Sequence, residues 1–171
     1  MNSDMTDKRC ILFAAPIGSS KTPIATYLSS MLGLAIHNND AIRTEVLEDG
    51  AEDFETEYLK RRDERIHAVL ASGIPFILDA SIDRRWEELR PKLDEAGYRY
   101  FIISLDFSPE LLDRIYRHKS YQDLENLKKT IADHEEFLAK HGSEIDLHLT
   151  DAEFRDRLKL SAEAVRRWIE G

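Results

Sequence analysis

The sequence predicts an α/β fold, a three-layer, doubly wound domain built around a parallel five-stranded sheet. Short apolar runs alternate with long amphipathic stretches about five times along the chain, which is typical of strands joined by helical crossovers. Most of these runs are apolar at successive positions, the pattern of strands that are covered on both faces. With 171 residues and no linker-like segment, the chain is expected to form a single domain over residues 1–171.

The five predicted strands span residues 10–14, 34–37, 75–78, 100–105 and 145–149. Between them, apolar side chains recur at a period near 3.6 residues in segments 54–70 and 121–138, which predicts amphipathic helices. Ser108, followed by a proline, predicts a helix N-terminus. Thr150 and Glu153 have the spacing of a capping box, so a last helix is expected after the fifth strand. Ligands of such sheets bind at the carboxyl ends of the strands.

The composition excludes several classes of protein. Hydrophobic residues make up 42% of the chain and charged residues 33%, which suits a buried core and not a disordered tail. The formal net charge of −9 disfavours an extended nucleic acid or an anionic membrane as the main partner. The single cysteine, the polar first seven residues and the lack of an apolar run of about 20 residues predict a cytoplasmic protein without disulfides, signal peptide or membrane span.

The segment after the first predicted strand is similar to a phosphate-binding loop. The general pattern is G-x-x-x-x-G-K-[ST] between a strand and a helix, and Lys21, Thr22 and the loop length match it. Ala15 and Ser20 replace the two outer glycines, whereas Gly18 remains inside the loop. The residues predicted to bind the nucleotide here are Ala15, Pro16, Ile17, Gly18, Ser19, Ser20, Lys21 and Thr22.

Such a loop binds phosphate through backbone N–H groups and a helix N-terminus, so small side chains at its outer positions are tolerated where φ is negative. Lys21 is expected to reach the β- and γ-phosphates of ATP, and the Thr22 hydroxyl is expected to ligate Mg²⁺. Pro23 suits the first turn of the following helix, where its missing N–H leaves no bond unmade. The alternative is a plain turn between strand and helix in which Lys21 and Thr22 are solvated.

Carboxylates follow the second and third predicted strands. Asp40 stands at the start of a helix, and Arg43, three residues later, shares its face. Asp79 directly ends an apolar strand, an arrangement by which a carboxylate holds Mg²⁺ through its water shell. The alternatives are that Asp40 caps its helix beside a surface Arg43, and that Asp79 caps the next helix, although Ser81 is the better candidate for that role.

Together, the loop, the Asp40-x-x-Arg43 element and the Asp79-Ala-Ser segment resemble the small P-loop kinases related to polynucleotide kinase and zeta toxin. The resemblance covers about residues 9–150 and implies a sheet of strand order 2-3-1-4-5. It also implies that Asp40 orients or deprotonates an acceptor hydroxyl. Arg43 would then hold a phosphate of the acceptor or the phosphate being transferred.

In these kinases, a helix after the fourth strand leads into a lid whose arginines close over the ATP phosphates. The resemblance places this lid and helical region at residues 108–141 and assigns Arg117 to catalysis and Arg114 to nucleotide binding. The two arginines are about one turn apart, so both could point into one site. The alternative is a solvated basic stripe on an amphipathic helix.

The predicted function is transfer of the γ-phosphate of ATP, with Mg²⁺ as cofactor, to a hydroxyl or phosphate of a small-molecule acceptor such as a nucleoside, nucleotide or sugar. The predicted catalytic residues are Lys21, Asp40, Arg43 and Arg117, and the predicted metal ligands are Thr22 and Asp79. Three alternatives stay open: an ATP-binding regulator or weak ATPase without an acceptor, a kinase of the zeta-toxin type, and a scaffold that binds no nucleotide.

Other charged residues are interpreted as surface. The segment around His134 lacks the spacing of a metal site and is expected to be a solvated helix face. Arg61, Arg62 and Arg65 lie among acidic residues, as on a charged helix surface, although the resemblance places the acceptor near that helix. For Arg84 and Arg85, contact with the acceptor and a solvated first helix turn are both open alternatives.

Overall fold

The computed structural model describes residues 7–119 and 122–171, and five parallel strands in this part of the chain form one sheet of order β2-β3-β1-β4-β5. The strands are β1 (Arg9–Ala14), β2 (Ala35–Asn38), β3 (Phe76–Ser81), β4 (Arg99–Leu105) and β5 (Leu147–Leu149). The predicted fold class and strand order are confirmed, and each predicted strand overlaps an observed one. Tyr121, at which one predicted helix begins, lies outside the described residues.

Helices connect the strands. The α-helices are α1 (Lys21–Leu32), α2 (Asn39–Glu48), α3 (Phe54–Ser72), α4 (Trp86–Glu95), α5 (Pro109–His118), α6 (Leu124–His141) and α7 (Arg157–Glu170), and the 3-10 helices are η1 (Gly142–Glu144) and η2 (Asp151–Asp156). Ser108 caps α5 as predicted, and the capping box of Thr150 and Glu153 is present. The box opens η2, which α7 follows directly. Among the described residues, no helix has the length and apolar character needed to cross a bilayer.

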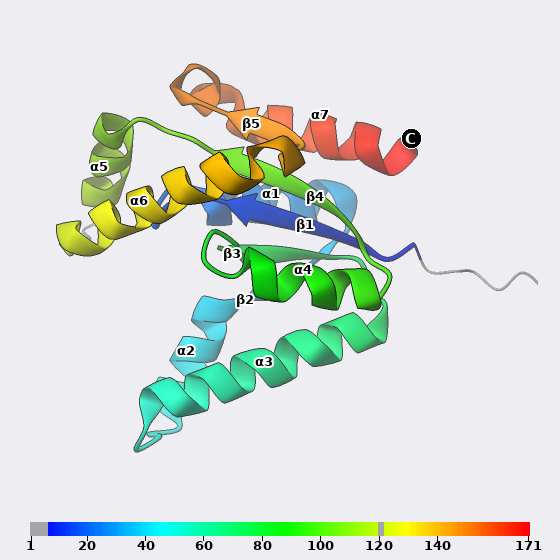
Figure 1. Ribbon diagram of the computed structural model, residues 1–171, viewed down its shortest axis with the longest axis vertical. Helices are drawn as coiled ribbons and strands as arrows, with labels where there is room; N and C mark the ends of the chain where they lie inside the picture. The colour runs from blue at the N-terminus through cyan, green and yellow to red at the C-terminus, as the bar shows by residue number, and fades with distance from the viewer. Residues whose placement is uncertain (1–6, 120–121) are drawn as a thin grey trace, which may run out of the picture.

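Helices cover both faces of the sheet (Figure 1). Successive residues of β1 point to opposite faces, so that Ile11 packs in one core cluster and Leu12 in the other. The first cluster includes side chains of α1, α5 and α7, and the second includes side chains of α3 and α4. α6 joins both clusters, through Leu127 and Phe137 respectively. The uniformly apolar strands therefore reflect burial on both faces.

β2 lies at one edge of the sheet, and its Ala35 and Ile36 are exposed. Beyond it, α2 and the first half of α3 extend away from the sheet at the bottom of Figure 1. These two helices share a small core of their own, made of Ile42, Val46 and Tyr58. The second half of α3 packs on the main body, because Ile66 and Leu70 belong to the second core cluster.

The arrowhead of β1 in Figure 1 points to the left, toward α5 and the first turns of α6. Since all five strands are parallel, their carboxyl ends meet at this end of the sheet. The segments that follow β1, β2 and β3 are thereby brought together, as expected for the ligand site of a doubly wound sheet.

Candidate active site

A cleft of about 700 Å³ opens at the carboxyl ends of β1, β2 and β3. Its lining comes from the β1–α1 loop (residues 15–20), α2, α3, the turn after β3, the end of α5 and one face of α6. Five residues singled out from the sequence line it together, namely Lys21, Thr22, Asp40, Arg43 and Asp79. The structure thus brings the segments after three different strands into one site.

The β1–α1 loop passes twice through left-handed backbone. Gly18 has a φ of 69°, which glycine adopts freely, and Ser20 has a φ of 79°. Ser20 is the one non-glycine residue with a positive φ within residues 7–119 and 122–171, and this conformation costs a residue with a Cβ about 1 kcal/mol or more. The condition under which a small side chain is tolerated, a negative φ, is therefore not met at Ser20. The loop keeps the backbone that a glycine would favour, with a serine in it.

Lys21 is the first residue of α1, and its side chain folds back onto the loop. Its Nζ donates to the Pro16 carbonyl at 2.9 Å, and Ser19 Oγ donates to the same carbonyl at 2.7 Å. Burial lowers the pKa of Lys21 to about 8, an effect that the charges of Asp83 and Asp79 partly offset. A bound anion at this position would favour the charged ammonium and raise the pKa again.

Binding of a nucleotide at this loop should be coupled to proton uptake by Lys21. Because its pKa is about 8 in the free protein, part of the population is neutral at about pH 8.5, and phosphate oxygens beside it restore the proton. Calorimetric titrations with ATP·Mg²⁺ at this pH, in buffers of different ionisation enthalpy, should report uptake of a fraction of a proton. Lys21→Arg should lose this uptake, because arginine stays protonated, and an unchanged proton count in that variant would contradict the assignment.

The same pKa predicts how stability depends on pH without ligand. Lys21 has a lower pKa in the folded protein than its ordinary value of 10.5. Between about pH 8 and 10.5 the unfolded chain therefore holds more of this proton, and the contribution of Lys21 to the free energy of unfolding rises with pH. Comparison of denaturant unfolding of wild type and Lys21→Met across this range isolates the contribution, and a difference that does not change with pH would refute it.

Thr22 and Asp79 form the candidate metal site. Thr22 Oγ1 donates to Asp79 Oδ2 at 2.9 Å, and Asn38 Nδ2 donates to the same oxygen at 3.4 Å. Burial raises the pKa of Asp79, whereas the Thr22 hydrogen bond and the Lys21 charge lower it. A hydroxyl beside a carboxylate fits Mg²⁺, which takes one or two protein oxygens and completes its shell with water and phosphate. No cluster of three or more acidic, histidine or cysteine ligands occurs in the described part of the chain.

Asp40 and Arg43 line the cleft from the first turns of α2. Asn38 caps this helix, since its Oδ1 accepts the Asp40 N–H at 2.8 Å. The alternative in which Asp40 is the cap is therefore wrong, and Asp40 directs no side-chain cap to its own helix. The Arg43 guanidinium carbon lies 4.0 Å from the centre of the Tyr58 ring on α3, a cation–π contact that orients it.

The three arginines of α3 have different surroundings. Arg61 and Arg65 form ion pairs with Glu45 of α2, at 3.0 and 2.9 Å, and so hold α2 against α3. Arg62 lines the cleft, with a side chain that is 15% exposed. All three pair with acidic residues, as the sequence indicated, and Arg62 is the one of the three that lines the cleft.

α5 does not bring the two predicted lid arginines into the cleft. Its buried face carries Leu111, Leu112 and Tyr116, which leaves Arg117 on the outside, paired with Asp113 at 2.8 Å and 62% exposed. Arg114 lines a separate pocket between α5 and η2. The prediction that both arginines point into one site with the loop is corrected by these positions, because the apolar stripe of α5 fixes which face turns inward.

Lys119, just after α5, contacts the β1–α1 loop, which Arg114 and Arg117 do not. Its Nζ donates to the Gly18 carbonyl at 3.3 Å, and the residue lines the cleft. The next two positions of the predicted lid, 120–121, lie outside the described residues. The local signal for Lys119 was its place three residues beyond Tyr116, the last buried residue of the helix.

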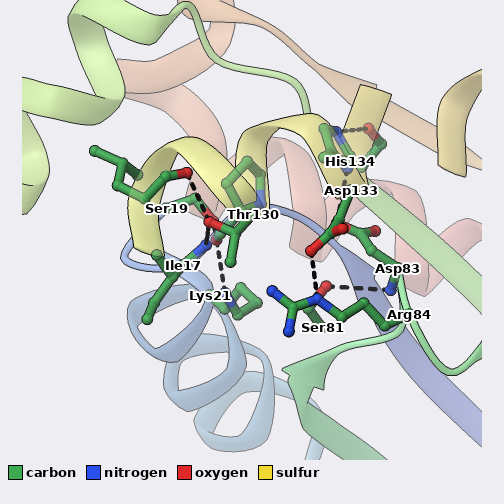
Figure 2. Close-up of polar contacts among 12 residues, drawn as sticks. Ile17, Ser19, Lys21, Ser81, Asp83, Arg84, Thr130, Asp133 and His134 are labelled. Carbon is green, nitrogen blue, oxygen red and sulfur yellow. Dashed lines mark hydrogen bonds and ion pairs between the residues drawn. The ribbon is translucent and has the colours of Figure 1, made fainter. Parts of the chain in front are cut away.

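α6 forms one wall of the cleft and bonds to two of its loops (Figure 2). Thr130 Oγ1 accepts the Ile17 N–H at 3.2 Å, and Asp133 forms an ion pair with Arg84 from the turn after β3. Ser81 helps to shape this turn, since its Oγ accepts the N–H of Asp83, and α4 begins only later, at Trp86. The expectation that Ser81 caps the next helix is therefore wrong.

His134 lies on the buried face of α6, only 3% exposed, so its interpretation as solvated is wrong. Its Nδ1 lies 3.1 Å from Asp83 Oδ2, and its Nε2 lies 3.5 Å from Ser104 Oγ. Asp83 lines the cleft, and its second oxygen has no hydrogen-bond partner among the described residues. The helical spacing from Leu127 could have revealed the burial of His134, but its contact with Asp83 has no local signal in the sequence.

Comparisons with known proteins bear on the fold. No protein-family model matches the chain, and no curated protein sequence matches it. The structure of the Mycobacterium tuberculosis APS kinase in complex with AMPPNP and APS is 18% identical, with a TM-score of 0.60, and the match covers 96% of this chain and 99% of that one. A gluconokinase from Sinorhizobium meliloti is 15% identical, with a TM-score of 0.62 and coverage of 96% and 95%. A shikimate kinase from Bacteroides thetaiotaomicron is 16% identical, with a TM-score of 0.61 and coverage of 95% and 98%.

The chain has the P-loop NTPase fold. Its parallel five-stranded sheet of order β2-β3-β1-β4-β5, flanked by helices, matches the fold of these neighbours, which are kinases. Within that class, the fold is the nucleotide-kinase-like form that the sequence resemblance implied.

Proposed function

We propose that this protein is an ATP-dependent phosphotransferase that transfers the γ-phosphate of ATP to a hydroxyl or phosphate of a small-molecule acceptor in the cytoplasm. The observation that carries the proposal is the convergence of Lys21, the Thr22–Asp79 pair and Asp40 on one cleft at the end of the sheet. The kinase fold of the structural neighbours supports it.

Each residue has a defined role in this proposal. Loop N–H groups and the Lys21 ammonium stabilise charge on the β- and γ-phosphates, because phosphoryl transfer depends on positioning and charge stabilisation. Thr22 and Asp79 hold Mg²⁺, which when bound neutralises phosphate oxygens. Asp40 takes the acceptor's hydroxyl proton while that oxygen bonds to the γ-phosphorus and the bond from phosphorus to the departing ADP oxygen breaks.

The charges of the cleft suit anionic ligands. The whole chain has 24 basic and 33 acidic residues, but the cleft lining reverses the balance. Its basic residues are Lys21, Arg43, Arg62, Arg84, Arg85 and Lys119, and its acidic residues are Asp40, Glu55, Asp79, Asp83 and Asp133. A local excess of basic groups raises the concentration of a nucleotide near an otherwise acidic protein.

The test combines binding with transfer. Calorimetry should detect ATP·Mg²⁺ binding, and single-turnover assays with radiolabelled ATP should detect transfer to at least one member of a panel of nucleosides, nucleotides, sugars and other metabolites. No thermal shift with any nucleotide would contradict the proposal and favour a scaffold. Binding without transfer beyond hydrolysis would instead favour the second candidate, an ATP-binding regulator, which the replacement of both outer loop glycines by Ala15 and Ser20 supports.

Asp79→Asn is expected to weaken ATP binding about tenfold in the presence of Mg²⁺ and to change it little in EDTA, because the lost carboxylate acts through the metal. Thr22→Val should also weaken ATP binding in the presence of Mg²⁺. In the double variant, the loss of binding free energy should be smaller than the sum of the two single losses, since both residues bind one ion. Calorimetric dissociation constants for the four proteins, with and without Mg²⁺, check this. An equal loss in EDTA would contradict the metal role.

A further inference from the structure

Arg157, the first residue of α7, is bonded to the β1–α1 loop from the other end of the chain. Its Nε donates to Ser20 Oγ at 2.9 Å, and its Nη1 donates to the Phe154 carbonyl at 2.8 Å. The guanidinium carbon also lies 4.3 Å from the centre of the Phe154 ring. Two hydrogen bonds and a stacked ring fix the direction of this side chain.

Ser20 needs such support because of its backbone. It precedes α1 with a φ of 79° and a ψ of 24°, and its side chain makes no capping hydrogen bond to its own helix. A serine in this position ordinarily has negative φ and caps the helix through its hydroxyl. Here the hydroxyl, in a residue that is 3% exposed, accepts from Arg157 instead. The bond therefore opposes relaxation of Ser20 toward negative φ.

The direction of the next residues depends on this turn. Lys21 and Thr22 follow Ser20 directly, so a change in its φ would move the Lys21 ammonium and the Thr22 hydroxyl together. The other left-handed residue of the loop is held in a similar way, since Lys119 donates to the Gly18 carbonyl. Lys119 and Arg157 thus both bond to the loop, at Gly18 and at Ser20, and burial and the Arg157 charge lower the pKa of Lys119.

We propose that Arg157 is a positioning residue of the phosphate loop, which holds the Ser20 hydroxyl and so maintains a left-handed turn that glycine would maintain unaided. The proposal rests on the proposed function, because it takes the ligand of the loop to be a nucleotide. It assigns Arg157 no contact with that nucleotide. It also explains how the loop keeps its shape although a serine replaces the glycine before Lys21.

The test is a double-mutant cycle between Arg157→Ala and Ser20→Gly, read out as the dissociation constant for ATP·Mg²⁺. Arg157→Ala should raise this constant about tenfold, the effect of losing one charged hydrogen bond, and Ser20→Ala should do the same. Ser20→Gly should bind at least as well as wild type, because glycine adopts positive φ freely. In the Ser20→Gly background, Arg157→Ala should then change binding less than about twofold.

Three results would overturn the proposal. Arg157→Ala could bind like wild type, Ser20→Gly could bind as weakly as Ser20→Ala, or Arg157→Ala could lose the same tenfold in the Ser20→Gly background. The last result would indicate a direct contact between Arg157 and the nucleotide. Arg155→Ala is the matched control, because this exposed arginine of η2 is two residues away and makes no contact with Ser20 in the described part of the chain; it should bind like wild type.

Thermal unfolding without ligand separates this inference from the proposed function. Arg157→Ala should lower Tm in the wild-type background and lower it less in the Ser20→Gly background, because the hydroxyl that Arg157 holds and the strain of the turn are then both absent. Wild type that binds no nucleotide would overturn the proposed function, while this pattern of Tm values would still show that Arg157 holds the turn. Additive Tm changes would instead overturn the role of Arg157.

Discussion

Lys21→Ala is expected to lower kcat/KM for phosphate transfer by about 10²–10³-fold, the usual effect of removing one group that stabilises transition-state charge in a desolvated site. Lys21 Nζ already lies at the loop, bonded to the Pro16 carbonyl at 2.9 Å, and phosphate oxygens would replace that carbonyl as its partner. Nucleotide affinity should fall as well, because the ammonium contacts phosphate before and during transfer. Steady-state kinetics and calorimetry on the same preparation measure both effects.

The matched control for this variant is Lys159→Ala. Lys159 lies on α7, its side chain is 73% exposed, and its ion pair with Glu163 is long, at 3.8 Å. The Lys159→Ala variant should therefore transfer phosphate at the wild-type rate. A Lys21→Ala variant with wild-type Tm and unchanged nucleotide affinity would show that the β1–α1 loop is not a phosphate site, and the proposed function would fail with it.

Asp40→Asn is expected to lower the transfer rate by about 10²–10⁴-fold, the contribution of a positioned general base, while the dissociation constant for ATP·Mg²⁺ changes less than about twofold. The two effects separate because Asp40 lines the cleft from α2 and acts on Lys21 and on Asp79 only through its charge. An asparagine keeps the size of the side chain and cannot take the proton. Single-turnover transfer and calorimetry distinguish the two quantities.

Asp94→Asn serves as the control, because Asp94 is an exposed residue of α4 with one long ion pair of 3.8 Å to Arg90. Transfer that survives Asp40→Asn unchanged would remove Asp40 from the mechanism and direct attention to Asp83, a cleft carboxylate whose Oδ1 has no hydrogen-bond partner among the described residues. A kinase of the zeta-toxin type makes a further prediction. Expression in cells would then arrest growth, and Asp40→Asn would relieve the arrest.

The fold could be predicted because its determinants are local. Apolar runs of strand length, the serine before Pro109 and the spacing of Thr150 and Glu153 are all patterns of a few residues, and the structure contains each corresponding element. The strand order followed from the resemblance carried by the loop and two strand-end motifs. Local patterns do not predict the position of β2 at the edge of the sheet, because this position depends on the arrangement of the other strands.

The site was predictable where it follows the ends of strands. Asp40, Asp79 and Lys21 reach one cleft because parallel strands present their carboxyl ends together. Arg117 was misplaced because two residues on one helical face indicate only that they point in the same direction. Whether that direction is the cleft or solvent depends on the apolar stripe of α5, and here the stripe occupies the inward face.

The contacts that could not be predicted join residues far apart in the sequence. The side chains of His134 and Asp83 form a hydrogen bond, and so do those of Arg157 and Ser20. Their proximity depends on how α6 and α7 pack. No spacing rule relates such pairs. The positive φ of Ser20 is equally hidden, because a serine gives no sign of the left-handed backbone that it adopts.

The attachment of α6 determines from which direction an acceptor can approach. This helix is fastened to the β1–α1 loop by Thr130 and to the turn after β3 by Asp133, and it contributes to both halves of the interior. It cannot swing outward without breaking all of these attachments. α2 and the first half of α3 have a separate interior of their own, and a long ion pair of 3.5 Å between Asp63 and Arg85 joins them to the turn after β3. We therefore expect the acceptor to enter the cleft, and its product to leave, on the side of α2 and α3. The α6 side forms the rigid wall of the cleft.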